Sequence, residues 1–345
     1  MRVLNRRLLI IAAALSAASL LVPYGASAQT DPRIAKAKQK GKVTWYTGVA
    51  PDELRSGLVN EFRAKTGLEV SIYYAGSGQI ISRLTTERKT GSRNTDVVTL
   101  ADLDLVAALN KDAVLRAYKS PVASSINPAY RDPNGTWYGF MFWGLSLAYN
   151  TKAVSPAEVP KAFADLADPK WKSKIVISDP ARSATGLLLL KAMVAERGWD
   201  WVERLMRNDP LVIAVAPAIT QSLVTGERIL GAGVTPYMSN ALKAGAPVAM
   251  MNKSEMLLIG PMTVSIVSEA PNQEGAELLV DYLLSQGAGK LFTQYGWFAS
   301  RPDVEGPYGF PPSKDIKVIH PNVTSPMTRE EILAKYNAIL QSTRK

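Results

Sequence analysis

Cysteine is absent from this chain of 345 residues, and histidine occurs once, as His320. Without cysteine the protein has no disulfide, no thiol nucleophile and no iron–sulfur cluster. A single histidine excludes a histidine-rich zinc site and the H-E-x-x-H helix of metalloproteases. The sequence also lacks a G-x-S-x-G nucleophile elbow, so a secreted hydrolase is only a distant alternative. We expect a protein that is not an enzyme and has no resident cofactor.

A long apolar run occurs at the N-terminus alone. Arg2, Arg6 and Arg7 precede an apolar run of 15 residues from Leu8 to Val22, and residues 26–28 have the small-x-small pattern of a signal-peptidase site. A membrane-spanning helix needs about 20 apolar residues, so the run is short for an anchor. Residues 1–28 are therefore predicted to be a secretory signal peptide, and the protein to be periplasmic.

The charge is moderately positive. Lysine and arginine number 40 against 30 aspartates and glutamates, a net charge of +10 that falls to +7 without residues 1–28. Nucleic-acid binding requires clustered cations. Only Lys36, Lys38, Lys40 and Lys42 lie close together, so we expect no nucleic-acid partner. A mild attraction for small anionic solutes is the more useful inference.

The hydrophobic pattern indicates alternating strands and helices. Residues 43–46, 68–74 and 96–98 predict strands, and helices are expected after Asp52, after Gly78 and through Leu109. Short links between such elements are typical of a parallel sheet covered on both faces. Further along, we predict strands over 145–149, 175–177, 211–213, 230–234 and 263–267, and helices over 186–193, after Thr220, over 272–284 and over 288–295.

This order predicts an α/β protein of two lobes, of the type II periplasmic-binding-protein fold, with a hinge and a ligand cleft between the lobes. The cleft is expected where strand ends and helix N-termini converge. We predict lobe 1 over 29–145, lobe 2 over 146–265, a return to lobe 1 over 266–318, and a C-terminal segment over 319–345 that packs on lobe 2.

Two predicted helix starts are suited to anions. The stretch Asp179–Gly186 leads from a strand into a helix, and Ser77-Gly78 opens a helix in the first half. Free N–H groups at a helix start carry about half a positive charge, and nearby hydroxyls add donors. Glycine permits close approach of a ligand to the backbone. Two such starts facing each other would hold a phosphate, phosphonate or carboxylate.

A series of short strings along the chain resembles the periplasmic solute-binding proteins of the ferric-ion type. The resemblance implies two hinged lobes, a captured small-molecule or metal ligand, delivery to an ABC permease in the inner membrane, and a monomer. The strings are Trp45-Tyr46-Thr47-Gly48, Lys65-Thr66-Gly67, Ser77-Gly78, Asp96-Val97, Tyr149-Asn150-Thr151-Lys152, Asp168-Pro169-Lys170-Trp171, Gly226-Glu227, Gly260-Pro261, Ala270-Pro271-Asn272 and Arg301-Pro302-Asp303.

The resemblance does not name the ligand, because that family takes iron(III), thiamine, polyamines, phosphonates and sugar phosphates. Its ferric members use two adjacent tyrosines, and Pro236-Tyr237 stands at that place here. The expected histidine and glutamate positions hold Val49-Ala50 and Ala101, beside Asp102. Iron(III) needs several anionic oxygen donors. Iron transport through Tyr237 therefore remains an alternative. Tyr237 and Asp102 alone would make a poor iron site, and Tyr46, Tyr73, Tyr74 or Tyr138 would have to add donors.

We predict capture of a small phosphonate, phosphate ester or carboxylate by lobe closure. Docking of the closed form on a sensor is a further alternative. Ser183 and Thr185 could equally be helix caps, Asp102 is more plausible as a cap than as a ligand, and Trp143 is placed before the strand into lobe 2. The predicted ligand-binding residues are Thr47, Ser77, Gly78, Asp102, Trp143, Arg182, Ser183, Ala184, Thr185 and Tyr237.

Overall fold

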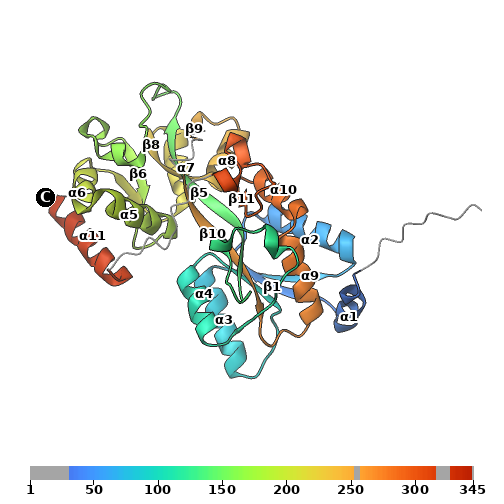
Figure 1. The fold of residues 1–345 in the computed structure, drawn as a ribbon. Helices are drawn as coiled ribbons and strands as arrows, with labels where there is room; N and C mark the ends of the chain where they lie inside the picture. The colour runs from blue at the N-terminus through green and yellow to red at the C-terminus, as the bar shows by residue number, and fades with distance from the viewer. Residues whose placement is uncertain (1–30, 252–256, 316–326, 344–345) are drawn as a thin grey trace, which may run out of the picture. The chain divides into compact units, whose positions relative to one another are not determined.

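The fold is taken from a computed structural model that describes residues 31–251, 257–315 and 327–343. The predicted signal peptide and His320 lie outside these ranges. Among the helices within them, none combines the length and apolar character that crossing a bilayer requires. Strands and helices alternate along much of the chain, as the sequence pattern predicts (Figure 1).

The described strands, eleven in number, form one sheet, in the order β2-β1-β3-β10-β5-β8-β6-β7, with β4, β9 and β11 paired at its sides. Three parallel strands stand at each end of this path. Between them β10 and β5 run antiparallel to each other. The bounds are β1 Val43–Thr47, β2 Val70–Tyr74, β3 Val97–Leu100, β4 Leu115–Arg116, β5 Tyr138–Asn150, β6 Ile175–Ser178, β7 Leu211–Ile213, β8 Leu230–Val234, β9 Val248–Met250, β10 Leu257–Val267 and β11 Phe298–Ala299.

The described helices flank this sheet. In α2, Leu54, Leu58 and Phe62 are buried at helical spacing, and Gly67 ends the helix in the left-handed conformation with φ of 69°. The α-helices are α1 Arg33–Lys40, α2 Asp52–Thr66, α3 Ser77–Lys89, α4 Leu103–Lys111, α5 Ala184–Arg197, α6 Trp199–Arg207, α7 Ala216–Thr225, α8 Thr235–Lys243, α9 Gln273–Leu283, α10 Gln286–Gln294 and α11 Arg329–Thr343.

Two long strands join the two groups of parallel strands. β5 has 13 residues and β10 has 11, and every residue of both is buried. They pair from Leu257 opposite Ser146 to Val264 opposite Tyr138, with a register shift between Met262 and Thr263. Since β10 also pairs with β3 and β5 also pairs with β8, hydrogen bonding continues from one end of the sheet to the other.

Asp96 fixes the first group of strands to α9. Its side chain is only 1% exposed, and it accepts hydrogen bonds from the backbone N–H of Thr44 at 2.7 Å and of Asn272 at 2.6 Å. Asn272 in turn caps α9 by accepting from the N–H of Gly275 at 3.0 Å. Burial raises the pKa of Asp96 to about 6, although these two donors oppose the shift.

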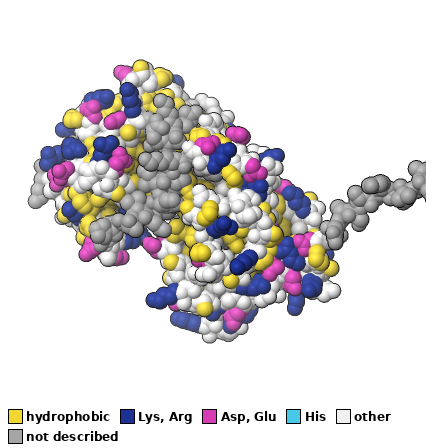
Figure 2. Space-filling model, viewed as in Figure 1, with side chains coloured by type: hydrophobic (Ala, Val, Ile, Leu, Met, Phe, Trp, Pro, Cys, Tyr) yellow, Lys and Arg dark blue, Asp and Glu magenta, His cyan; other side chains and the backbone are white. Residues whose placement is uncertain are grey.

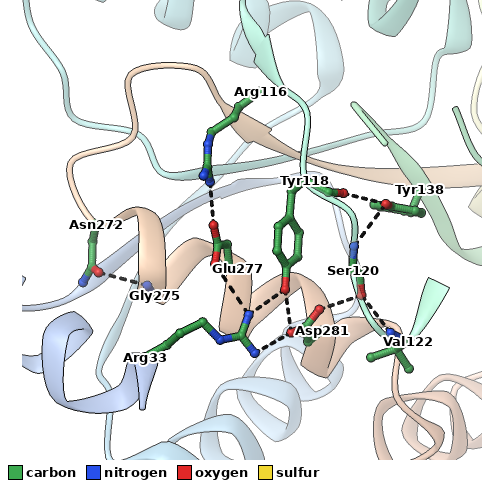
Figure 3. A network of polar contacts seen from close by, with 10 residues as sticks. All are labelled: Arg33, Arg116, Tyr118, Ser120, Val122, Tyr138, Asn272, Gly275, Glu277 and Asp281. Carbon is green, nitrogen blue, oxygen red and sulfur yellow. Dashed lines mark hydrogen bonds and ion pairs between the residues drawn. The ribbon is translucent and has the colours of Figure 1, made fainter. Parts of the chain in front are cut away.

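A second polar network holds α1 and the segment after β4 against α9 (Figure 3). Asp281 accepts from Arg33 at 2.8 Å, from the hydroxyl of Tyr118 at 2.8 Å and from the hydroxyl of Ser120 at 2.6 Å. One turn earlier on α9, Glu277 accepts from Arg116 at 2.7 Å. These contacts tie segments far apart in the sequence, and we assign them to stability.

The C-terminal helix lies beside α6 (Figure 1). It buries Ile332, Tyr336 and Ile339, which follow helical spacing, and the Lys335 ammonium stands 4.8 Å from the ring centre of Trp199. The α6 helix in turn packs on α5. The start of α11 is therefore held near the second group of parallel strands. The exact lobe boundaries stay a prediction.

Two local predictions differ from the structure. The helix expected to start at Thr220 begins at Ala216, because Pro217 sits in its first turn, where proline is well tolerated. Trp143 does not precede its strand but lies in the middle of β5, which begins five residues earlier at Tyr138. The glycines in this apolar stretch made the strand look shorter in the sequence pattern than it is in the structure.

Candidate functional site

A cavity of about 250 Å³ opens between the starts of α4, α5 and α11. Its floor is made by the middle of β5 and β10, its walls by the first turns of α4 and the exposed side of α5. It is lined by Ala101, Asp102, Leu103, Asp104, Trp143, Ala181, Arg182, Ser183, Ala184, Leu187, Leu188, Lys191, Gly260, Pro261 and Arg329. This is the convergence of strand ends and helix starts that the sequence predicts.

The start of α5 offers backbone donors to this cavity. Asp179 holds the preceding turn together. Its backbone carbonyl accepts from the N–H of Ser183 at 2.9 Å, and its carboxylate accepts from the N–H of Ala181 at 2.9 Å. Ser183 is the N-cap residue but makes no side-chain cap hydrogen bond. Its hydroxyl instead lies 2.7 Å from that of Thr185, which is 2.8 Å from the hydroxyl of Ser178. The first turn of α5 thus carries the partial positive charge of a helix start without a side-chain cap.

The start of α4 is organised differently. Asp102 is its N-cap, and its carboxylate accepts from the N–H of Asp104 at 3.0 Å and of Leu105 at 3.4 Å. Ser77, the first residue of α3, accepts from the N–H of Ala101 at 3.3 Å. The protein's own groups therefore occupy these donors. On this side the cavity presents a carboxylate, whereas on the α5 side it presents amides.

The floor of the cavity depends on the pairing of Trp143 with Gly260. The two residues are direct partners across β5 and β10. A Cβ atom added to Gly260 would lie 2.0 Å from Cζ2 and 2.2 Å from Cε2 of the Trp143 indole. The indole, 8% exposed, therefore packs directly against Gly260, where the Cβ atom of any other residue would overlap it. Together with Pro261 it gives the cavity an apolar floor.

Three cations line the cavity from three segments of the chain. Arg182 precedes α5, Lys191 lies two turns into α5, and Arg329 is the first residue of α11. Over the described residues none of the three forms an ion pair. Asp104 on the opposite wall is likewise outside every ion pair described. Elsewhere basic side chains are spread over the visible face (Figure 2).

Tyr237 lies outside the lining of this cavity, in the first turn of α8. Burial raises its pKa, and the nearby phenol of Tyr74 adds to the shift. Tyr74 ends β2, is 54% exposed, and has the Arg55 guanidinium 3.9 Å from its ring centre. Tyr74 of β2 thus contributes to the electrostatic surroundings of Tyr237 in α8.

Five of the ten predicted ligand residues line the cavity and the other five do not. Those that line it are Asp102, Trp143, Arg182, Ser183 and Ala184. Thr185 stands behind Ser183, and Ser77 contacts the lining residue Ala101. Thr47 is fully buried and accepts from the Thr99 hydroxyl at 2.6 Å. At Gly78 an added Cβ would meet open space.

Sequence reasoning missed Lys191, Arg329 and Gly260 as lining residues. The signal for Arg329 is a cation in the first turn of a helix, where acidic residues are favoured. Lys191 and Gly260 carry no local signal, because their place follows from tertiary packing. A wider hollow of about 820 Å³ lies over residues 119–138. It includes none of the predicted ligand residues, so we place the site at the smaller cavity.

Comparison with known proteins agrees with this architecture. A family model described as bacterial extracellular solute-binding protein matches residues 93–318. Iron uptake protein A1 of Synechocystis is 25% identical over 257 residues, 69% of each chain. A putative 2-aminoethylphosphonate-binding periplasmic protein of Salmonella typhimurium is 26% identical over 246 residues, 68% of this chain and 70% of the relative.

Among solved structures, iron-bound HitA of Pseudomonas aeruginosa superposes with a TM-score of 0.69 at 18% identity. The match covers 88% of this chain and 99% of that one. The predicted fold and the predicted resemblance are confirmed. Within the described residues there is no group of three or more histidine, cysteine, aspartate or glutamate side chains that could hold a metal ion.

Proposed function

We propose, since this chain belongs to the bacterial extracellular solute-binding protein family, that it captures a small organic anion in the cavity between α4, α5 and α11. The observation that carries the proposal is the start of α5, which lacks a side-chain cap and opens into a cavity lined by three cations outside any ion pair described. A phosphonate, phosphate ester or carboxylate would neutralise this excess of positive charge.

The size and chemistry of the cavity support an organic anion over a bare ion. Ligand pockets typically measure about 300–1,000 Å³, and this one is close to that range at about 250 Å³. The indole of Trp143 and the side chain of Leu188 supply apolar surface, which a hydrated inorganic ion would not use. The anionic group would lie at the amide of Ala184 and the hydroxyl of Ser183, where the helix start favours negative charge.

Capture would proceed by closure of the two lobes over the solute. A ligand that contacts α4 from one lobe and α5 from the other stabilises the closed form by contacts that the open form lacks. The closed form would then deliver the solute to an ABC permease in the inner membrane. This function places the protein in the periplasm, exported by its N-terminal signal peptide.

The proposal is tested by titration calorimetry of the purified protein with ethylphosphonate, glycerol 3-phosphate and succinate. Binding of at least one is expected, and it should weaken as ionic strength rises because exposed charges are screened. Arg182→Gln should weaken it roughly 10- to 100-fold, since one charged contact is worth roughly 1.5–3 kcal/mol. Absence of binding by all three anions, together with tight binding of ferric citrate, would overturn the proposal.

Ferric iron is the second candidate, since the phenol of Tyr74 lies near enough to Tyr237 to affect its pKa. Two phenolates are hard oxygen donors of the kind that iron(III) prefers. The raised pKa of Tyr237 opposes this role, because the phenol must lose its proton to bind iron. A visible tyrosinate-to-iron absorption band on ferric loading, lost in both Tyr237→Phe and Tyr74→Phe, would support iron. A colourless protein under the same loading would exclude tyrosinate ligation.

A further inference from the structure

The first turn of α11 carries a cation where the helix itself disfavours one. The N-terminus of a helix bears about half a positive charge, so an arginine there is repelled. Arg329 nevertheless occupies the first position of α11, is exposed, and has no ion-pair partner over the described residues. Its position contributes nothing to helix stability.

The backbone around this arginine is well fixed. Thr328 caps α11, since its hydroxyl accepts from the N–H of Glu331 at 3.2 Å and the Glu331 carboxylate accepts from the N–H of Thr328 at 2.7 Å. This reciprocal capping box defines where the helix begins. It also engages the Glu331 carboxylate. The arginine is thus presented at the cavity by an ordered helix end.

A second cation, Lys191, lines the same cavity. Lys191 is seven residues beyond Ala184 on α5, about 10 Å along the axis at 1.5 Å per residue. A single small anion bound at the start of α5 is therefore too far from Lys191 to contact its ammonium group. Between the two positions the wall is apolar, formed by Leu187 and Leu188 of α5, with Trp143 on the floor.

We propose that Lys191 and Arg329 form a second anion subsite, so that the solute carries two anionic groups joined by a short apolar segment. One group lies at the start of α5, the apolar segment lies along Leu187 and Trp143, and the other group reaches Lys191 and Arg329. This proposal rests on the proposed function and narrows its substrate class to organic solutes with two separate anionic groups. Asp104 on the opposite wall disfavours a third negative group.

The test compares matched ligands that differ in one charge. Calorimetry is performed with alkylphosphonates and with the ω-carboxyalkylphosphonates of the same chain length, from two to five methylene groups. At the best length the added carboxylate should tighten binding about tenfold, the value of one charge-assisted contact. In Arg329→Met and in Lys191→Met this gain should shrink to less than about threefold, while alkylphosphonate binding changes less than about twofold.

Arg204→Met is the matched control, because Arg204 is exposed on α6, outside the cavity lining and outside any ion pair described. It should leave both ligand series unchanged. If alkylphosphonates bind and the added carboxylate gives no gain at any length, the second subsite is overturned while the proposed function stands. The second subsite is also overturned if the affinity gained from the added carboxylate is unchanged in both Arg329→Met and Lys191→Met. If no phosphonate binds but glycerol 3-phosphate or succinate does, the second subsite is overturned and the proposed function stands; if none of these anions binds, both proposals fail. Since the ligand comparison is made in the unaltered protein, it does not depend on the folding of any variant.

Discussion

Replacing Gly260 by alanine tests the floor of the cavity directly. The new Cβ would lie 2.0 Å from the indole of Trp143, whereas two carbon atoms in contact are about 3.5–4.0 Å apart. The indole or the strand must therefore move by about 1.5–2 Å. Overpacking of this kind costs about 1–3 kcal/mol. The open side of the indole is the cavity, so we expect the ring to shift into the space that the ligand needs.

Two measurements follow the effect of Gly260→Ala. Urea unfolding should show a loss of about 1–3 kcal/mol in the free energy of unfolding. Calorimetry with the best anion of the panel should show binding weakened about tenfold, which corresponds to 1.4 kcal/mol. Combining Gly260→Ala with Trp143→Leu should restore part of the stability, because the smaller side chain removes the clash, but not the affinity.

Gly57→Ala in α2 is the control. Its Cβ would meet only Leu291, at 4.0 Å, so the change should stabilise the protein by about 0.5–1 kcal/mol, as expected for alanine in place of glycine within a helix. The control should leave anion binding unchanged. Our account of the floor would be refuted if Gly260→Ala kept both its stability and its affinity, or if the Trp143→Leu combination were no more stable than Gly260→Ala alone.

The remaining predictions concern one buried acid, one hydroxyl in the cavity lining and one phenol outside it. With its pKa raised from 3.8 to about 6, Asp96 contributes stability that is full below pH 3.8 and is lost as the pH rises through about 6. Asp96→Asn should remove that pH dependence from urea midpoints measured between pH 4 and 6. If the midpoints of the variant changed with pH as steeply as those of the parent, the prediction would be wrong. Ser183→Ala should weaken anion binding about threefold to tenfold in calorimetry, since it removes one donor beside the α5 amides, whereas an unchanged Kd would remove Ser183 from the site. Tyr237→Phe should change anion binding less than about twofold, and a larger loss would favour the ferric alternative.

The fold could be predicted from the sequence because the signals are local. Apolar runs such as Val43–Thr47 and the helix-ending Gly67 act within a few residues, so elements and their order follow from the pattern. The stretch Asp179–Gly186 likewise indicates a strand-to-helix turn suited to an anion. By contrast, the strand start at Tyr138 is fixed by pairing with β10, which lies more than 100 residues away.

The candidate site could be predicted only in part, for the same reason. Arg182, Ser183 and Ala184 lie at a helix start that the pattern reveals. Lys191 and Arg329 reach the cavity because α6 packs on both α5 and α11, and that packing has no local signature. Thr47, expected at the ligand, lies buried against Thr99, since the end of β1 is covered in the assembled sheet.

The central pair of strands has a mechanical consequence. β5 and β10 both support the cavity floor, through Trp143 and Gly260, and link the two groups of parallel strands. A rotation of one group against the other must twist this two-stranded ribbon, and the register shift between Met262 and Thr263 is the place where its ladder is least regular. In the proposed function, recognition and pivoting would share the same few residues, so a solute that contacts the indole of Trp143 would act on the pivot itself.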